Sequence, residues 1–326
     1  MNAVDHNNVV IFDDRGIPSI MCRFVRPKDT EEVPAVFKIG DKVADAIYIS
    51  KYPNIVIDGR AYSMPMADPT VNITFDEAVQ ACRCKGLGWH LMTAVEYEYL
   101  LNQSREKGTM PHGNTDWGKD YYHNEEQGKV SNLGRTYTGT GPVTWNHDHT
   151  PYGVSDLNGN VWEWLAGLRI KDGVIEFIPG NKAVSPYCDL SKDSTEWQQA
   201  ETSKGPVRAN VECGEITITD AVAADDYEPN CDGVRIEELE VKLSEIPQVL
   251  KDLGIIPDKR AEEEGKTYVY FDATEGEYLP IRGSAFGSTT FSGPSALSLD
   301  DPRSHSGGNV GFRSAFYEVN GKLITE

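Results

Sequence analysis

Apolar residues near the amino terminus follow strand-like spacing. Two apolar runs, at 8–14 and 17–25, are separated by a turn-forming stretch around Gly16 and predict a β-hairpin. Residues 46–64 contain further apolar runs on both sides of the turn dipeptide Asp58-Gly59, which predicts another pair of strands. We expect residues 1–45 to form a small N-terminal β segment ahead of the main domain.

Helical spacing replaces the strand pattern in the next part of the chain. Residues 72–88 and 89–108 each place apolar residues on one face, which predicts two amphipathic helices. In both stretches a threonine is followed three residues later by a glutamate, the sequence signature of a capping box. These pairs are Thr74 with Glu77 and Thr93 with Glu96.

The centre of the chain, residues 168–270, is irregular in pattern and rich in acidic residues. We interpret it as an insertion that packs on the main domain. Its apolar positions from Ile236 to Leu250 fall mostly on one side of a helical projection, so a helix is expected there.

The segment 282–315 has a different composition from the rest of the chain. Its ends, Ile-Arg-Gly and Val-Gly-Phe-Arg-Ser-Ala-Phe, are typical of buried strands, and Ser, Gly, Thr and Asp dominate between them. Lys, Glu, Gln, Met and Trp are all absent from 283–312, although each occurs elsewhere. The segment is either a Ser/Gly-rich surface loop or a surface whose side chains are exchanged between variants.

Net charge and the absence of long apolar stretches exclude several classes of partner and location. The net charge of −20 argues against nucleic acid or an anionic membrane as the partner, because phosphate binding requires clustered Lys and Arg. No basic segment precedes an apolar run at the start of the chain, and no stretch approaches the length of a membrane span. We therefore expect cytoplasmic synthesis, no membrane insertion, and export by another route if the protein acts outside the cell.

The six cysteines show no CxxC pair and no zinc-ligand spacing. Free thiols are expected for a cytoplasmic product, although Cys188, Cys213 and Cys231 lie in one region that leaves a disulfide open.

Three motifs in order carry a family resemblance. HLMTAVEYEYL (90–100) resembles R-L-P-T-E-A-E-W-E-Y-A, YGVSDLNGNVWEW (152–164) resembles Y-G-L-Y-D-M-x-G-N-V-W-E-W, and RGSAF…VGFRSA (282–315) resembles R-G-G-S-W…G-F-R-C-A. This set is similar to the formylglycine-generating-enzyme-like family. The resemblance implies an α+β, C-type-lectin-type fold with mixed short strands, two helices and much irregular structure over 46–326. The motifs match about 46–167 and 270–318, on either side of the acidic insertion.

Within that superfamily, 282–313 resembles the variable region of proteins diversified by retroelements. The predicted scaffold positions of this region include Arg282, Gly283, Ala296, Leu297, Leu299, Arg303, Gly311, Phe312 and Arg313. In this family, adenines of template Asn codons are randomised, which never yields Lys, Glu, Gln, Met or Trp, the set missing here. The resemblance implies a ligand-binding set of Phe286, Gly287, Ser288, Phe291, Ser298, Asp300, Asp301, His305, Gly307 and Gly308.

An enzyme of the same fold is the alternative. Formylglycine-generating enzymes use a pair of cysteines near the carboxyl end that bind copper as thiolates. This chain has no cysteine after Cys231, and Ser314 stands where the family ending has Cys. A relay of serine, His305 and Asp301 would lie in the segment that varies, so we expect no catalytic residues, no cofactor and no enzyme.

A calcium site is also conceivable, because relatives bind Ca²⁺ near the N-V-W-E-W strand. Here it would use Asn160 and Glu163. The competing interpretation packs Trp162 and Trp164 in the core and pairs Glu163 with an arginine such as Arg313.

The function expected from the sequence is a hypervariable ligand- or receptor-binding protein, with a phage tail as a plausible location. Its partner would be a protein or surface ligand on a host or target cell. A bacterial protein outside any phage and a structural virion protein without a ligand are the rival hypotheses.

Overall fold

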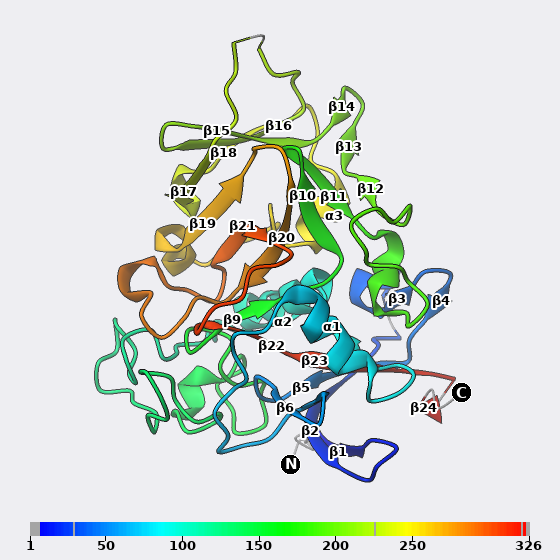
Figure 1. The fold of residues 1–326 in the computed structure, drawn as a ribbon, viewed down its shortest axis with the longest axis vertical. Coiled ribbons are helices and arrows are strands. Elements are labelled where there is room, and N and C mark those ends of the chain that lie inside the picture. Colours follow the sequence, from blue (N-terminus) through cyan, green and yellow to red (C-terminus); the bar gives the residue numbers. More distant parts are fainter. Residues whose placement is uncertain (1–6, 29, 225, 321, 324–326) are drawn as a thin grey trace.

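The computed structural model describes residues 7–28, 30–224, 226–320 and 322–323, and strands make up most of its regular structure (Figure 1). The α-helices of these residues are α1 (Phe75–Arg83), α2 (Ala94–Lys107) and the short α3 (Gln248–Asp252). Short 3₁₀ segments are η1 (Ala35–Phe37), η2 (Val143–Trp145), η3 (Pro179–Val184, kinked at Gly180 and Asn181), η4 (Ile236–Glu238), η5 (Glu262–Lys266) and η6 (Thr289–Phe291). No helix of the described part is long and apolar enough to cross a membrane.

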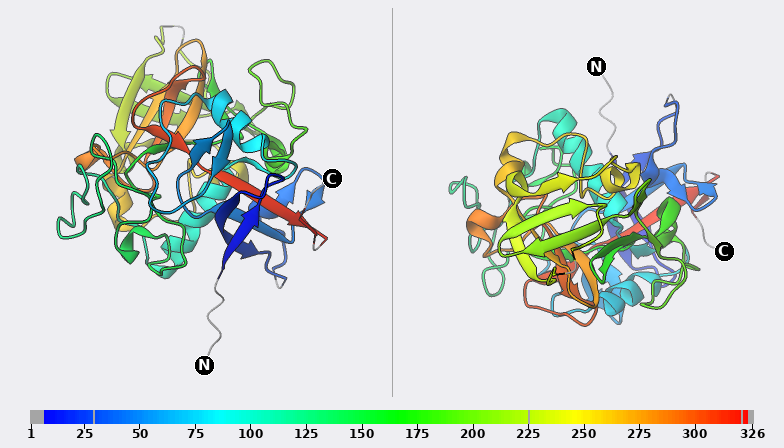
Figure 2. Two further views of the ribbon diagram at one scale, coloured as in Figure 1. Left: turned by 60° about the horizontal axis from the view of Figure 1, so that its bottom comes forward. Right: turned by 90° about the horizontal axis from the view of Figure 1, so that it is seen from above.

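The first sheet joins the beginning and the end of the described chain. Its strands run in the order β1 (Asn8–Phe12), β2 (Pro18–Val25), β5 (Ala46–Ser50), β23 (Ser314–Val319) and β24 (Lys322–Leu323), with β8 (His90–Leu91) beside β23. The predicted hairpin is confirmed, because β1 and β2 pair in antiparallel register. Figure 2 shows β23, in red, beside the blue strands of this sheet. The N-terminal segment thus extends a sheet of the main fold.

Both predicted capping boxes are present. In α1 the Thr74 backbone N–H donates to Glu77 at 2.9 Å and the Glu77 N–H donates back to the Thr74 hydroxyl at 3.3 Å. In α2 the equivalent distances for Thr93 and Glu96 are 2.8 Å and 3.2 Å. The turn predicted at 58–59 also forms, with positive φ at both residues, between β6 (Ile55–Ile57) and β7 (Arg60–Tyr62).

The second sheet contains the rest of the larger strands. Its main path is β17 (Cys231–Arg235), β19 (Tyr268–Asp272), β21 (Leu297–Pro302), β20 (Glu277–Arg282), β10 (Leu168–Lys171), β11 (Val174–Phe177), β15 (Arg208–Glu212), β16 (Glu215–Thr219) and β18 (Glu240–Lys242). Off this path, β12 (Gln198–Gln199) pairs with β11, and β9 (Trp162–Trp164) pairs with β20 and with β22 (Val310–Phe312). Two minor hairpins are β3 (Lys38–Ile39) with β4 (Lys42–Val43) and β13 (Glu201–Thr202) with β14 (Gly205–Pro206).

The acidic region 168–270 contributes strands to this second sheet. β10 pairs with β20, and β17 pairs with β19, so strands from the region stand on both sides of the β20–β21 pair. The view from above in Figure 2 shows its yellow-green strands lying across the top of the molecule. Its apolar residues therefore complete the main core: Val211, Ile216 and Ile218 belong to the same cluster as Ile49 and Leu100.

The helix expected from Ile236 to Leu250 is wrong. The chain forms η4, then β18 in parallel pairing with β16, and becomes α-helical only at Gln248. Pro247 explains the late start, because proline lacks an N–H for a preceding helical turn and disfavours helical backbone at the residue before it. All six cysteines are free, as expected; Cys213 and Cys231 are exposed.

Candidate ligand-binding surface

Arg313 fixes the end of the 282–313 segment inside the protein. Its guanidinium is fully buried and donates to both carboxylate oxygens of Glu163, at 2.9 Å and 2.7 Å. It also donates to the carbonyl oxygens of Ser50, Lys51 and Ser155 at 2.8–3.0 Å. Burial opposes the charge, but Glu163 more than compensates and the pKa of Arg313 is raised. One side chain thus joins β9, the end of β5 and the 145–160 loop.

Two more arginines of the segment point inward in the same way. Arg282 donates to Glu98 of α2 at 3.1 Å and lies over the Tyr97 ring. Arg303 forms a two-point pair with Glu277 of β20, at 2.8 Å and 2.9 Å. The apolar scaffold positions predicted in the segment are buried: Ala296, Leu297, Leu299 and Phe312. The segment is therefore held by charge pairs and apolar side chains at alternate positions.

The strand β21 turns a polar row toward the surface. Ser298 lies between Tyr270 of β19 and Ile281 of β20. Opposite β20, the register then slips by one residue, since Leu279 faces Asp301 while Ile281 faces Ser298. Such a bulge re-aims side chains. Here Asp300 and Asp301, although adjacent in sequence, both lie within hydrogen-bond distance of the Ser298 hydroxyl, the second at 2.8 Å. This hydroxyl has one proton and donates it to one carboxylate at a time.

These residues form the floor of an open hollow of about 380 Å³. His305 stands at one side, with its Nε2 atom 3.4 Å from Asp301 Oδ1. Phe291 is 44% exposed and meets the Tyr268 ring edge-on at 4.5 Å. The lining residues are Trp162, Tyr270, Ile281, Gly287, Ser288, Thr289, Phe291, Ser298, Asp300, Asp301, His305, Asn309 and Val310.

A second hollow, of about 390 Å³, adjoins the first. It is lined by Leu133, Ala285, Phe286, Gly287, Ser288, Gly308 and Asn309. Gly287, Ser288 and Asn309 line both hollows, so the two form one surface. Of the ten residues predicted to bind ligand, nine line this surface. Gly307 flanks it, since a side chain there would approach Asn309 and His305.

The structure differs from the prediction at Ser298, which is only 4% exposed. Its hydroxyl orients the two aspartates instead of projecting outward. Sequence reasoning also missed residues from other segments. Trp117 and Leu133, 61% and 68% exposed, stand beside Phe286 and the second hollow. The backbone N–H of Trp117 donates to the backbone carbonyl of Phe286 at 2.7 Å, and the two aromatic rings meet edge-on. No local signal in the sequence links these positions.

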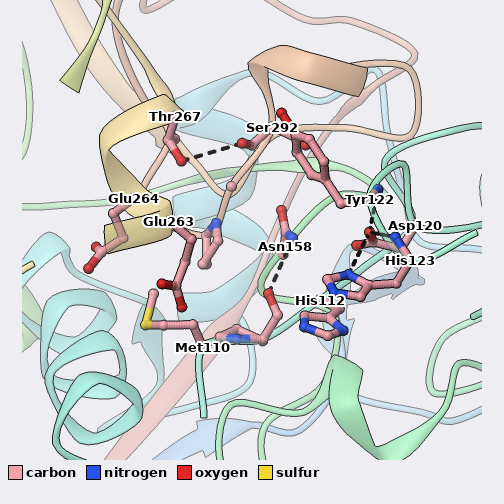
Figure 3. A pocket seen from close by; sticks show the side chains of 13 residues that line it. Met110, His112, Asp120, Tyr122, His123, Asn158, Glu263, Glu264, Thr267 and Ser292 are labelled. Carbon is pink, nitrogen blue, oxygen red and sulfur yellow. Dashed lines mark hydrogen bonds and ion pairs between the residues drawn. The ribbon is translucent and has the colours of Figure 1, made fainter. Parts of the chain in front are cut away.

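A third hollow, of about 270 Å³, lies near the base of the 289–294 loop (Figure 3). Its walls include Met110 and Pro294, with His112 and His123 stacked at 3.7 Å. Each imidazole bonds a carboxylate through Nδ1, from Glu126 and Asp120 respectively. None of the ten predicted residues lines it. Across the described chain, no group of three or more His, Cys, Asp or Glu side chains is placed to hold a metal ion.

The residues proposed for calcium are used for other contacts. Both oxygens of Glu163 bond Arg313, which supports the competing interpretation. Asn160 Oδ1 accepts from the Thr136 N–H at 2.8 Å and from the Asn114 amide at 3.2 Å. A cation there would meet a guanidinium already paired with the carboxylate, so the two side chains do not fit calcium as placed. Calcium binding stays a prediction to which this geometry gives no support.

Ser314, which stands where the family motif has a cysteine, is buried and makes structural contacts. The Ser314 hydroxyl is buried 2.9 Å from the Ser50 hydroxyl, and the Ser314 N–H donates to Asn54. His305 and Asp301 are adjacent, but no serine hydroxyl of the described residues bonds the His305 ring. A nucleophile–base pair is therefore not assembled there.

With this geometry in place, comparison with known proteins shows where the fold belongs. Residues 51–208 match the family described as "Sulfatase-modifying factor enzyme 1-like domain". The fold is of the formylglycine-generating-enzyme-like, C-type-lectin type. The predicted α+β fold class is thereby confirmed, and the resemblance to the formylglycine-generating-enzyme-like family is confirmed over residues 51–208. A curated relative, the formylglycine-generating enzyme of Mus musculus, is 36% identical over 105 residues, which span 30% of this chain and 27% of that protein.

Several solved structures also match this chain, all at low sequence identity and low TM-score. PvdO from Pseudomonas aeruginosa covers 95% of this chain and 98% of its own, at 13% identity and a TM-score of 0.39. Treponema denticola variable protein 1 covers the same shares at 12% identity and a TM-score of 0.36. The Major Tropism Determinant I1 Variant covers 83% of this chain and 50% of its own, at 12% identity and a TM-score of 0.32.

Proposed function

We propose that this protein is a hypervariable ligand-binding protein that displays exchangeable side chains on a rigid lectin-type scaffold. The observation that carries the proposal is that surface positions and scaffold positions alternate within the 282–313 segment. Nine of the ten positions expected to vary line one open surface. The three arginines of the segment are paired with glutamates instead; Arg282 and Arg313 are buried and Arg303 is half-buried. Exchange at the surface would therefore leave the scaffold contacts in place, as in antibody loops.

The proposal includes diversification by a retroelement and a surface ligand on a host or target cell. The residue types absent from 283–312 support this origin. Assembly on a phage tail is the location that we propose, since variable relatives are named as tropism determinants. The oxidoreductase alternative has less support, because the carboxyl-terminal part of this sequence supplies no thiol.

Two matched libraries displayed on yeast test the proposal. The first randomises the ten predicted ligand-binding codons with the fifteen permitted residue types. The second randomises scaffold positions of the same segment, among them Leu297, Leu299 and Phe312. We expect most members of the first library, and few of the second, to resist protease and reach the cell surface.

Selection of the first library against a panel of purified proteins should then yield specific binders. Equal loss of folded protein in both libraries would contradict a display surface. A near-copy of the segment in neighbouring DNA, differing only at adenines and beside a reverse transcriptase gene, would test diversification separately.

A further inference from the structure

Several buried glutamates of this protein are paired with guanidinium groups. Four glutamates that are at most 6% exposed each pair with at least one arginine: Glu98, Glu163, Glu264 and Glu277. Asp300 and Asp301 are half-buried and, within the described chain, have no such partner. Among the described residues neither forms an ion pair with Lys or Arg, and the imidazole of His305 is the ion-pair partner of Asp301.

The two aspartates are held together in spite of their like charges. The bulge in β21 and the shared hydroxyl of Ser298 fix both carboxylates on one side of the strand. Burial, followed by the charge of Asp300, raises the pKa of Asp301. The thiol of Cys231 lies 3.9 Å from Asp300 and adds no positive charge. A cation entering the hollow would relieve this repulsion.

Aromatic rings stand beside the carboxylates. Tyr270 neighbours Ser298 across the β19–β21 pair and lines the hollow, and the half-exposed Phe291 ring lies on the rim. Tyr268 supports Phe291 from the side. Aromatic faces attract cations, and planar guanidinium groups stack on them particularly well.

We propose that this hollow binds the guanidinium of an arginine side chain on a protein partner. The inference rests on the proposed function and names the chemistry that this variant would recognise. Two adjacent carboxylates can accept a fork of N–H donors, which a lysine ammonium cannot provide. Trp117 and Leu133, exposed on the adjoining rim, would contact the protein surface around that arginine. The net charge of −20 favours the approach of a basic partner.

The test uses the full chain and three pentapeptide probes of the form Gly-Gly-X-Gly-Gly-amide. X is arginine, lysine or citrulline, the uncharged analogue of arginine, and binding is followed by NMR titration. The arginine peptide should bind about tenfold more tightly than the other two. The double variant D300N/D301N should weaken arginine-peptide binding by about tenfold. The matched control E262Q/E263Q removes the same charge from exposed positions and should change binding by less than about twofold.

Binding of the citrulline peptide as tight as that of arginine, or equal weakening in both double variants, would overturn the proposal. Equal binding of lysine would overturn the guanidinium assignment. Sedimentation would reveal any self-association of the parent chain. Self-association that disappears in D300N/D301N would assign the arginine to a second copy of this chain and overturn the proposal that it belongs to a different protein. If the peptides fail while the surface library still folds and yields binders, only this inference is lost and the proposed function stands.

Discussion

The charged residues of 282–313 fall into two groups that obey opposite rules. Arg282, Arg303 and Arg313 are directed inward, and each meets a glutamate from a different element. Asp300 and Asp301 face an open hollow without an arginine or lysine partner in the described chain. The first group stabilises the fold through pairs that leave no charge unmatched. The second group leaves charge unmatched at the surface, where a ligand can meet it.

This division follows from strand geometry. Side chains of β21 alternate, so Leu297 and Leu299 enter the core while Ser298 lies on the other face. A single segment can therefore serve folding and recognition at interleaved positions, provided that exchange is confined to one set. The comparison predicts that equal chemical changes in the two sets have unequal effects on stability.

The largest effect is expected at Arg313. Replacing it by methionine leaves the Glu163 carboxylate buried without its partner, which should lower the free energy of unfolding by about 3–5 kcal/mol. Urea denaturation measures the loss. The double variant R313M/E163L removes both charges and should recover a substantial part of it. Equal losses in the single and double variants would show that the ion pair is not what the scaffold depends on.

A smaller loss of stability is expected from alanine substitution at Gly283, and almost none at Gly287, only four residues away. Gly283 has φ of +93°, and a β-carbon there would lie 2.6 Å from the Leu157 carbonyl oxygen. Gly283→Ala should therefore cost about 2 kcal/mol of unfolding free energy. Gly287 lies on the proposed binding surface, where a β-carbon would contact Trp117 at an ordinary 3.6 Å. Gly287→Ala should change stability by less than about 0.5 kcal/mol.

Thermal unfolding of the two alanine variants, followed by circular dichroism, checks this contrast. A Gly287→Ala variant as unstable as Gly283→Ala would mean that the surface position belongs to the scaffold.

Features with local signals could be predicted from the sequence. Both capping boxes, the hairpin around Gly16 and the turn at 58–59 formed as expected, because their hydrogen bonds join residues close in the chain. The role of 168–270 could not be predicted in the same way. Pairing of β10 with β20 and of β17 with β19 joins residues far apart in sequence, and one chain carries no direct signal of such register.

The candidate surface shows the same limit. The residues of 286–308 could be proposed from the sequence because composition and motif mark a continuous segment. Trp117 and Leu133 come from a separate loop that folding brings to Phe286, so nothing near them in sequence marked their position. Ser298 was predicted to bind ligand, but it is buried with its hydroxyl beside two aspartates, an arrangement that depends on the bulge opposite the partner strand.

The smallest effect is a gain in stability at Asp300. Burial and the Asp300 charge raise the pKa of Asp301 above its ordinary 3.8, so the folded state retains a proton that the unfolded state releases. Stability is consequently lost as the pH rises through the interval between these pKa values. Asp300→Asn removes the neighbouring charge and lowers the pKa of Asp301. At pH 7 the variant should be about 0.5 kcal/mol more stable than the parent.

Urea denaturation at several pH values tests this prediction. The advantage of Asp300→Asn should narrow as the pH falls through the raised pKa of Asp301 in the parent, since protonation of Asp301 removes the repulsion. The exposed control Glu262→Gln should follow the parent at every pH. If Asp300→Asn is less stable than the parent at pH 7, Asp300 stabilises the fold, as the scaffold arginines do. A gain would show instead that this carboxylate is retained at the expense of stability, as expected for a residue that serves recognition.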